Sequence, residues 1–117
     1  TGFGLLGHLK EMATNFPGSI EIEYSSIPLA SFARRGASQF IFPDNTTKNF
    51  NFVKENVSAL TGEQMLVLCD PQTSGGLLFT FDENEETKVL ELFHEQQEQL
   101  YIIGKTTQKK EHEIQIV

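Results

Sequence analysis

Apolar residues near the start of the chain recur every three or four positions, which is the spacing of one face of a helix. They are Leu5, Leu6, Leu9, Met12, Ala13 and Phe16, with polar residues between them. The pattern predicts an amphipathic helix over residues 5–16. Pro17 and Gly18 follow, and we expect them to end this helix, because proline cannot continue the hydrogen-bond ladder and glycine tolerates left-handed geometry.

Two glycines, Gly4 and Gly7, lie one turn apart on the same side of this predicted helix. Glycine costs about 1 kcal/mol relative to alanine in a helix interior, so the pair indicates that something approaches the helix closely. Two interpretations stay open. The glycines serve a functional contact, or they let a neighbouring strand or helix pack tightly.

The pattern then changes to a period of two. Apolar and acidic residues alternate over residues 20–24, which predicts a strand with one buried and one solvated face. Residues 29–35 are a short helix candidate that Gly36 should end. Residues 37–58 show no sustained period, and we expect an irregular segment, packed down by its phenylalanines, with one short helix or strand near residues 49–55.

Apolar runs flank a polar loop in the second half of the chain. Residues 65–69 fit either a short helix or a buried strand, and periodicity cannot decide between them. Residues 76–81 are apolar on both faces, which is typical of a strand in the middle of a sheet. Asp82 resembles an N-cap, and Glu85 could close a capping box. The following helix should bury Val89, Leu90, Leu92 and Phe93.

Two strands are expected at the end of the chain, over residues 101–106 and 113–117. A polar turn around Lys109 and Lys110 would join them as a terminal pair. Helices that alternate with partly antiparallel strands predict an α+β fold, with a mixed, largely antiparallel sheet packed with helices. The length of 117 residues fits a single domain.

Composition narrows the function classes. A formal charge of -7 argues against a nucleic-acid or anionic-membrane surface, because there is no basic field to release counterions. No apolar run approaches the ~20 residues that span a bilayer, and no signal peptide is visible, so we expect a cytoplasmic setting. The chain opens on TGFG without Met, and we expect it to be a piece of a longer protein. Cys69 is the only cysteine, and we expect it to be a small buried hydrophobic residue.

Two segments could carry chemistry. The first is the start of the predicted helix, where free backbone N–H groups and the helix dipole favour an anion such as phosphate. It consists of Thr1, Gly2, Phe3 and Gly4. The second is the loop of residues 70–76, whose amides and hydroxyls could cradle an oxyanion or hold a facing domain. A simple turn is the alternative for this loop. His8, His94 and His112 show no metal-ligand spacing, and we expect ordinary surface or core-edge residues there.

Both segments extend into longer motifs. They are residues 1–13, with the sequence TGFGLLGHLKEMA, and residues 69–78, with CDPQTSGGLL. These motifs resemble the two signature stretches of the selenophosphate synthetase (selenide, water dikinase) family. Asn49, after a loop that contains Phe-Pro-Asp, and Ile103-Gly104 fall where that family has similar residues. The resemblance runs over the whole chain but covers only the C-terminal domain of the enzyme.

The resemblance implies the α+β fold of the C-terminal domain of the aminoimidazole ribonucleotide synthetase superfamily, within a two-domain enzyme. That enzyme uses ATP and selenide to make selenophosphate, with release of AMP and phosphate, and magnesium bridges the nucleotide phosphates. Its reactive Cys or selenocysteine, the nearby Lys and most metal-binding aspartates belong to the N-terminal domain. This chain would therefore hold no catalytic and no metal residue, and Cys69 does not match the catalytic cysteine. The implied partners are the chain's own N-terminal domain and a second copy, in a homodimer formed mainly by that absent domain.

The residues that would face the interdomain ATP cleft are Thr1, Gly2, Phe3, Gly4, Asp70, Gln72, Thr73, Ser74, Gly75 and Gly76. A packing role for Asp70 and Pro71, with the loop supporting the ATP site, stays open beside direct contact. Two other functions also stay open. The chain could be a free-standing acidic module that binds an anion or a protein, or the matching domain of a related ATP-using synthetase or kinase.

Overall fold

The computed structural model describes residues 1–117 and has an α+β architecture built on a three-stranded mixed sheet. The strands are β1 (Ser19–Ile22), β2 (Gly104–Thr107) and β3 (Ile114–Ile116). The α-helices are α1 (Gly4–Ala13), α2 (Ser31–Ser38), α3 (Asn45–Val53), α4 (Gly62–Leu68) and α5 (Glu86–Glu95). Two short 3₁₀ helices, η1 (Tyr24–Ser26) and η2 (Glu83–Glu85), complete the list. The predicted fold class is confirmed.

The order of strands in the sheet is β2-β1-β3. Ile20 of β1 lies opposite Thr106 of antiparallel β2 and opposite Ile114 of parallel β3. The prediction that the last two strands pair with each other is therefore wrong, because β1 lies between them. Burial explains the order: β1 is the strand with the most buried side chains, and the polar, exposed β2 suits an edge.

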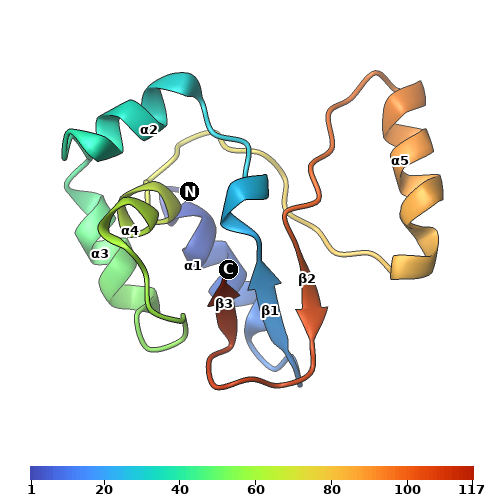
Figure 1. The fold of residues 1–117 in the computed structure, drawn as a ribbon, viewed down its shortest axis with the longest axis horizontal. Helices are drawn as coiled ribbons and strands as arrows, with labels where there is room; N and C mark the ends of the chain where they lie inside the picture. Colours follow the sequence, from blue (N-terminus) through green and yellow to red (C-terminus); the bar gives the residue numbers. More distant parts are fainter.

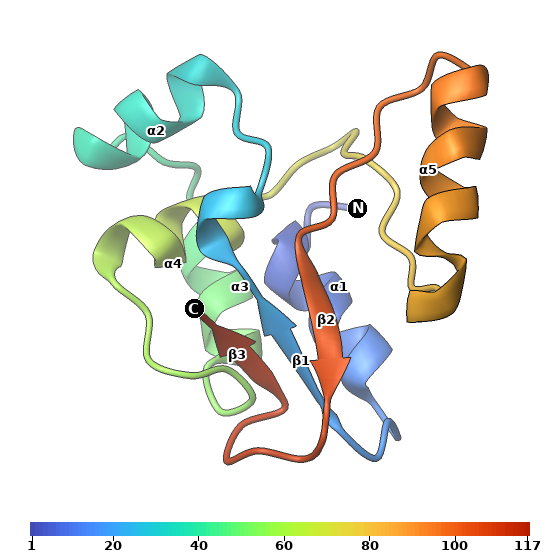
Figure 2. The same ribbon diagram turned by 45° about the vertical axis from the view of Figure 1, so that its right-hand side comes forward.

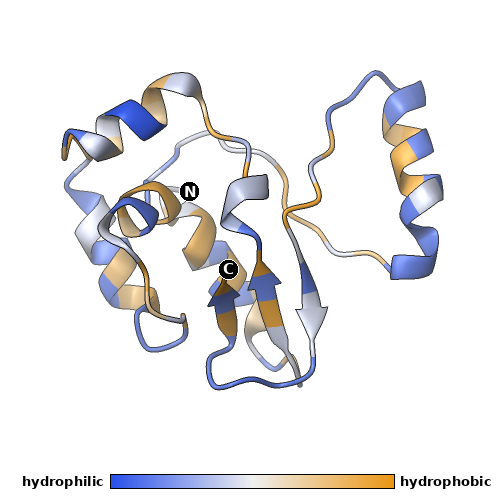
Figure 3. Cartoon of the chain, in the orientation of Figure 1, coloured by the Kyte–Doolittle hydropathy of each residue, from blue (hydrophilic) through white to orange (hydrophobic).

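The core lies where α1 packs against the sheet, and α3 and α4 cover α1 from the other side (Figures 1 and 2). The apolar face predicted for α1 supplies Leu6, Leu9 and Ala13 to this core. The colouring in Figure 3 shows the same apolar face on α1 and on the central strand. The remaining buried members are Ile20, Ile22, Val53, Val57, Leu68, Cys69 and Ile114. None of the helices combines the length and the apolar character needed to cross a bilayer.

Both segments whose structure the sequence left open, residues 65–69 and the short element within residues 37–58, are helical. The apolar run before the polar loop forms α4, because Thr61 accepts a hydrogen bond from the Gln64 N–H and Gln64 Oε1 accepts one from the Thr61 N–H. This reciprocal capping box belongs to helices and has no counterpart in a strand. The short element expected within residues 37–58 is α3, which begins at Asn45, four residues before the expected start.

The ends of the helices differ from the predictions. Asn15, with φ of 64°, and not Gly18, takes the left-handed conformation after α1. Helix α2 runs through Gly36 and ends at Ser38. Phe40, two residues later, has φ of 55°, and the Ile41 N–H donates to the Gly36 carbonyl. These are the bonds of a Schellman ending, in which a residue other than glycine takes the left-handed position.

Residues 77–103, which we call the α5 arm, extend from one side of the sheet (orange in Figures 1 and 2). The strand predicted over residues 76–81 is wrong: the segment is irregular and Leu77 is 88% exposed. Both edges of β1 are occupied by β2 and β3, so the segment has no ladder partner at the centre of the sheet. An apolar sequence without such a partner does not form a strand.

The arm's helix also differs from its prediction. No residue of α5 is buried, and Leu90 and Leu92 are exposed. Phe93 of α5 stacks on Phe79 of the arm, with ring centroids 5.9 Å apart. Asp82 does act as a cap, because its carboxylate accepts from the Asn84 N–H, but it begins η2 and forms no capping box with Glu85.

Candidate functional site

The two segments predicted to carry chemistry lie against each other. The Gly2 N–H donates to the Gln72 carbonyl at 3.0 Å. Gly4 has φ of 72°, and a Cβ at this position would lie 2.9 Å from the Cys69 carbonyl carbon. The close approach inferred from the glycines is therefore packing: α1 begins directly against the end of α4, which leads into the loop of residues 70–76.

Asn49 of α3 joins the two segments. Its side-chain amide nitrogen donates to the Gly2 carbonyl at 2.7 Å and to the Cys69 carbonyl at 2.9 Å. One side chain from a third element therefore bonds to the backbone of both. Composition around Asn49 did not indicate this role, and only the family resemblance singled the residue out.

Hydrogen-bond donors without partners gather in the loop. No backbone N–H of residues 73–76 and neither hydroxyl of Thr73 and Ser74 forms a hydrogen bond in the structure. Helix α1 likewise has no side-chain cap at its start, so its first N–H groups are free. Gln72 folds back over the loop, because its Oε1 lies 2.9 Å from where a Cβ of Gly75 would be. Such donors suit the oxygens of an anion.

A hydroxyl, an imidazole and a carboxylate form a chain at the start of α1. Thr1 Oγ1 lies 2.7 Å from His8 Nε2, and His8 Nδ1 lies 3.0 Å from Glu11 Oε2. The Phe3 ring lies against the His8 ring, with centroids 5.9 Å apart. Sequence reasoning treated His8 as an ordinary residue, and the prediction is incomplete on this point. The i,i+3 spacing of His8 and Glu11 was the available signal, because such residues are neighbours on a helix.

Asp70 and Cys69 stand side by side in different environments. Asp70 is half-buried, its carboxylate has no hydrogen bond or ion pair, and burial raises the pKa of this carboxyl above its usual value. Cys69 is 0% exposed, and burial raises the pKa of its thiol to about 11. A protonated, inaccessible thiol is a poor nucleophile, so the structure confirms that Cys69 is a core residue.

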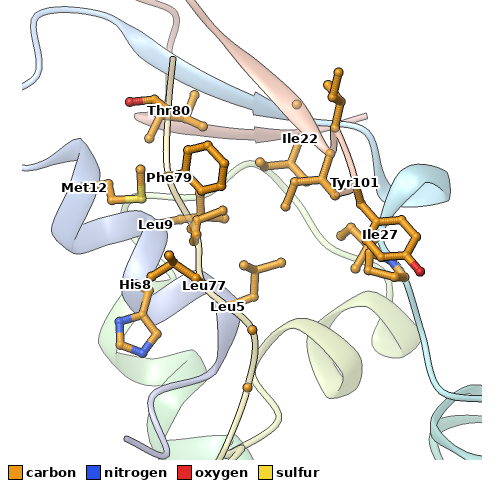
Figure 4. Close-up of a pocket in the computed structure, with 18 of the residues that line it drawn as sticks. Leu5, His8, Leu9, Met12, Ile22, Ile27, Leu77, Phe79, Thr80 and Tyr101 are labelled. Carbon is orange, nitrogen blue, oxygen red and sulfur yellow. The ribbon is translucent and has the colours of Figure 1, made fainter. Parts of the chain in front are cut away.

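A wide pocket of about 1370 Å³ lies beside these segments, between α1, β1 and the α5 arm. Figure 4 shows Leu5 and Leu9 of α1 near Leu77 and Phe79 of the arm, with His8 at the edge of the group. Of the predicted site residues, the pocket is lined by Thr1, Gly4, Gln72, Thr73, Ser74, Gly75 and Gly76. Gly2, Phe3 and Asp70 lie outside this lining.

The donor set fits an anion better than a metal ion. No group of three His, Cys, Asp or Glu side chains comes together anywhere in the structure. Asp70 is the only carboxylate of the two segments, so by themselves these residues offer a magnesium ion one charged ligand. Lys10 of α1 is already used elsewhere, since its Nζ donates to the Phe52 carbonyl and lies over the Phe52 ring. Apart from the Asp70 carboxylate, the side chains and backbone N–H groups of the two segments are neutral.

Comparisons with known proteins show what this chain is similar to. Residues 1–117 match the family described as "AIR synthase related protein, C-terminal domain". The chain is 42% identical over 114 residues to the selenide, water dikinase of Campylobacter jejuni strain RM1221, which covers 97% of this chain and 33% of the relative. It is 38% identical over 117 residues to the selenide, water dikinase of Pseudomonas aeruginosa, which covers 100% of this chain and 34% of the relative.

A third relative, the selenide, water dikinase of Pasteurella multocida, is 35% identical over 117 residues, which is 100% of this chain and 33% of the relative. The chain thus spans about a third of the length of the curated relatives it matches. The family match covers the whole chain, including both segments of the candidate site. This chain therefore belongs to the family of the AIR synthase related protein, C-terminal domain.

Proposed function

We propose that this chain is the C-terminal domain of a two-domain selenide, water dikinase, which makes selenophosphate from selenide and ATP and releases AMP and phosphate. The observation that carries the proposal is the convergence of residues 1–4 and 70–76 into one surface with free N–H and hydroxyl donors. The similarity to selenide, water dikinases over the whole chain supports the choice of reaction.

In this proposal the chain forms one wall of the ATP cleft. The N–H groups of residues 73–76, the hydroxyls of Thr73 and Ser74 and the free N–H groups of α1 donate hydrogen bonds to phosphate oxygens. Backbone and hydroxyl donors orient phosphates without adding charge, because they are neutral dipoles. Magnesium, when bound, would neutralise the phosphate charge, and its ligands would come from the N-terminal domain.

The chemistry itself would belong to that other domain. The two segments offer no accessible thiol, since the adjoining Cys69 is fully buried and protonated. A wall of this kind contributes by orienting the substrate and excluding water, and not by bond making. We therefore propose that residues 1–117 alone are inactive. We also propose that the full-length enzyme works in the cytoplasm and is a homodimer through its N-terminal domain.

The test uses the full-length protein encoded by the gene of this chain. We expect selenide-dependent formation of AMP and selenophosphate, followed by ³¹P NMR, and no turnover by residues 1–117 alone. ATP cleavage that does not depend on selenide would instead indicate a related ATP-using synthetase or kinase. A gene that encodes only residues 1–117 would favour a free-standing binding module.

Residue roles are tested by Thr73→Ala combined with Ser74→Ala in the full-length enzyme. We expect kcat/KM to fall by about tenfold or more, with little change in unfolding temperature, because both hydroxyls are exposed and bond to nothing in the structure. Thr87→Ala on α5 is the control, since it removes another exposed hydroxyl outside the site. An unchanged rate in the double variant would leave the loop with a structural role only.

A further inference from the structure

The amide group of Asn49 has all of its hydrogens in use. A side-chain NH₂ carries two hydrogens, and here one is donated to the Gly2 carbonyl and the other to the Cys69 carbonyl. Both oxygens therefore lie within 3 Å of the same nitrogen. Carbonyl oxygens that converge in this way repel each other unless a donor lies between them, so Asn49 holds together two parts of the backbone that would otherwise separate.

The two carbonyls occupy positions that control the candidate site. A peptide unit is planar, so the direction of the Gly2 carbonyl also sets the direction of the Phe3 N–H, and the Cys69 carbonyl sets that of the Asp70 N–H. Each anchored peptide thus precedes the free donors of its segment along the chain, which are the first N–H groups of α1 and the N–H groups of residues 73–76. The Cys69 carbonyl is also among the last of α4, where the helix itself offers no partner.

Glycine makes this anchoring necessary. Gly2 and Gly4 have φ of 80° and 72°, a region open to glycine but strained for other residues. Glycine enters this region easily but also leaves it easily, because no side chain restricts its backbone. The segment of residues 1–4 therefore needs a bond from outside to keep one conformation, and besides the Gly2 to Gln72 bond Asn49 supplies it.

We propose that Asn49 is a positioning residue: it fixes the separation and the orientation of the two segments, so that their donors meet the same ligand. This inference rests on the proposed function, in which that ligand is the phosphate chain of ATP. Asn49 itself donates both hydrogens to the protein, so it acts through the Gly2 and Cys69 peptides and does not contact the substrate.

The experiment compares Asn49→Asp with Asn51→Asp in the full-length protein. Asp has the shape of Asn but replaces the two N–H donors by an oxygen that faces two carbonyl oxygens. Asn51 is on the same helix, is exposed and forms no side-chain hydrogen bond, so its change to Asp adds the same charge without touching the site. Asn49→Ala serves if Asn49→Asp does not fold, since it removes the donors without repulsion.

Two measurements are made below the unfolding temperature of every variant. We expect Asn49→Asp to lower kcat/KM for ATP by about 10- to 100-fold, because displacement of positioning groups by about 1 Å can have that effect. Amide hydrogen exchange should become faster at Gly2, Asp70 and Gln72, whose N–H groups are hydrogen-bonded within the two segments, and stay unchanged in the sheet. Asn51→Asp should match the unmodified protein in both, and Asn49→Gln, which keeps the donors, should recover part of the activity.

Equal kcat/KM and equal exchange in the two Asp variants would overturn the inference. An Asn49 variant that is less stable but, while folded, as active as the unmodified enzyme would also overturn it. That result would indicate a purely structural role for Asn49. The proposed function fails separately: an unmodified protein without selenide-dependent activity would refute it. In that case the exchange of the two segments still decides whether Asn49 positions them.

Discussion

At the scale of single residues, the site places a side chain that stabilises the fold beside one that destabilises it. Cys69 is packed and protonated, whereas its neighbour Asp70 keeps a half-buried carboxylate without a partner. An unpaired carboxylate in a partly apolar place destabilises the fold, because burial disfavours its charged form. Residues that lower stability in this way are common at functional sites.

Asp70→Asn should raise the stability of residues 1–117 at pH 7. Because burial raises the pKa of Asp70, the stability that this group provides is complete below the ordinary carboxyl pKa and is lost as the pH rises above it. The neutral amide avoids this loss, and we expect the unfolding temperature to rise by about 1–4 °C, measured by circular dichroism. The gain should shrink as the pH approaches about 4.

Asp44→Asn is the control for this change. Asp44 is exposed and its side chain caps nothing, so the variant alters the net charge equally without relieving a buried carboxylate. If both variants shift the unfolding temperature alike, the effect comes from net charge. A lower stability of Asp70→Asn would mean that the carboxylate has a partner in solution.

At the scale of elements, the contact between the start of α1 and the end of α4 builds the site. Gly4 permits it, since a Cβ at this position would lie only 2.9–3.0 Å from backbone atoms of Cys69 and Leu68. Neither α1 nor α4 shows this contact in its own pattern of apolar residues, because the contact involves backbone and a missing side chain. Only the glycine in the first turn of α1 signalled a close approach.

Gly4→Ala should destabilise residues 1–117 by about 2–4 kcal/mol. The added Cβ would lie 2.9 Å from backbone that cannot move independently, and φ of 72° strains any residue with a side chain. The free energy of unfolding is measured by urea denaturation. Gly62→Ala is the matched control: Gly62 begins α4, a Cβ there meets nothing within 4 Å, and its φ is not positive.

For Gly62→Ala we expect no loss, and up to about 1 kcal/mol of added stability, because alanine restricts the unfolded chain. Equal effects of the two alanines would show that Gly4 is not tightly packed in solution.

Helix ends limited the prediction at this scale. Asn15, Phe40 and Gln97 take the left-handed positions after α1, α2 and α5, although glycine is the usual residue there.

At the scale of the whole molecule, the chain divides into a packed body and the α5 arm. The body contains every buried core residue, whereas the arm has none. Apolar residues of the arm, such as Leu77 and Ile102, remain exposed beside the wide pocket. Exposed apolar side chains that gather beside a pocket are typical of an interaction surface.

Leu77→Ala should therefore change the stability of residues 1–117 by less than about 0.5 kcal/mol, because its side chain is already in water. Leu68→Ala, the same change at a fully buried position of α4, should cost about 2–5 kcal/mol. Both values come from urea denaturation. Comparable losses would mean that residues 76–81 pack into the body in solution, as their apolar pattern first predicted.

The pattern of apolar and polar residues alone was enough to predict the elements that bury one clear apolar face. The helical period placed α1, the alternation of apolar and acidic residues placed β1, and Cys69 was correctly expected in the core. The two signature motifs also identified the residues that the fold brings together. These features depend on which side chains avoid water, and a sequence carries that information residue by residue.

Only the tertiary structure decided which strand stands at the centre and which segments stay unpaired. Residues 76–81 had the composition of a central strand, but β2 and β3 occupy both edges of β1, and the segment pairs with neither outer edge of the sheet. The same holds for the site: the bonds from Asn49 to Gly2 and Cys69 span 47 and 20 residues. Contacts between distant residues depend on how the whole chain packs, and no local period encodes them.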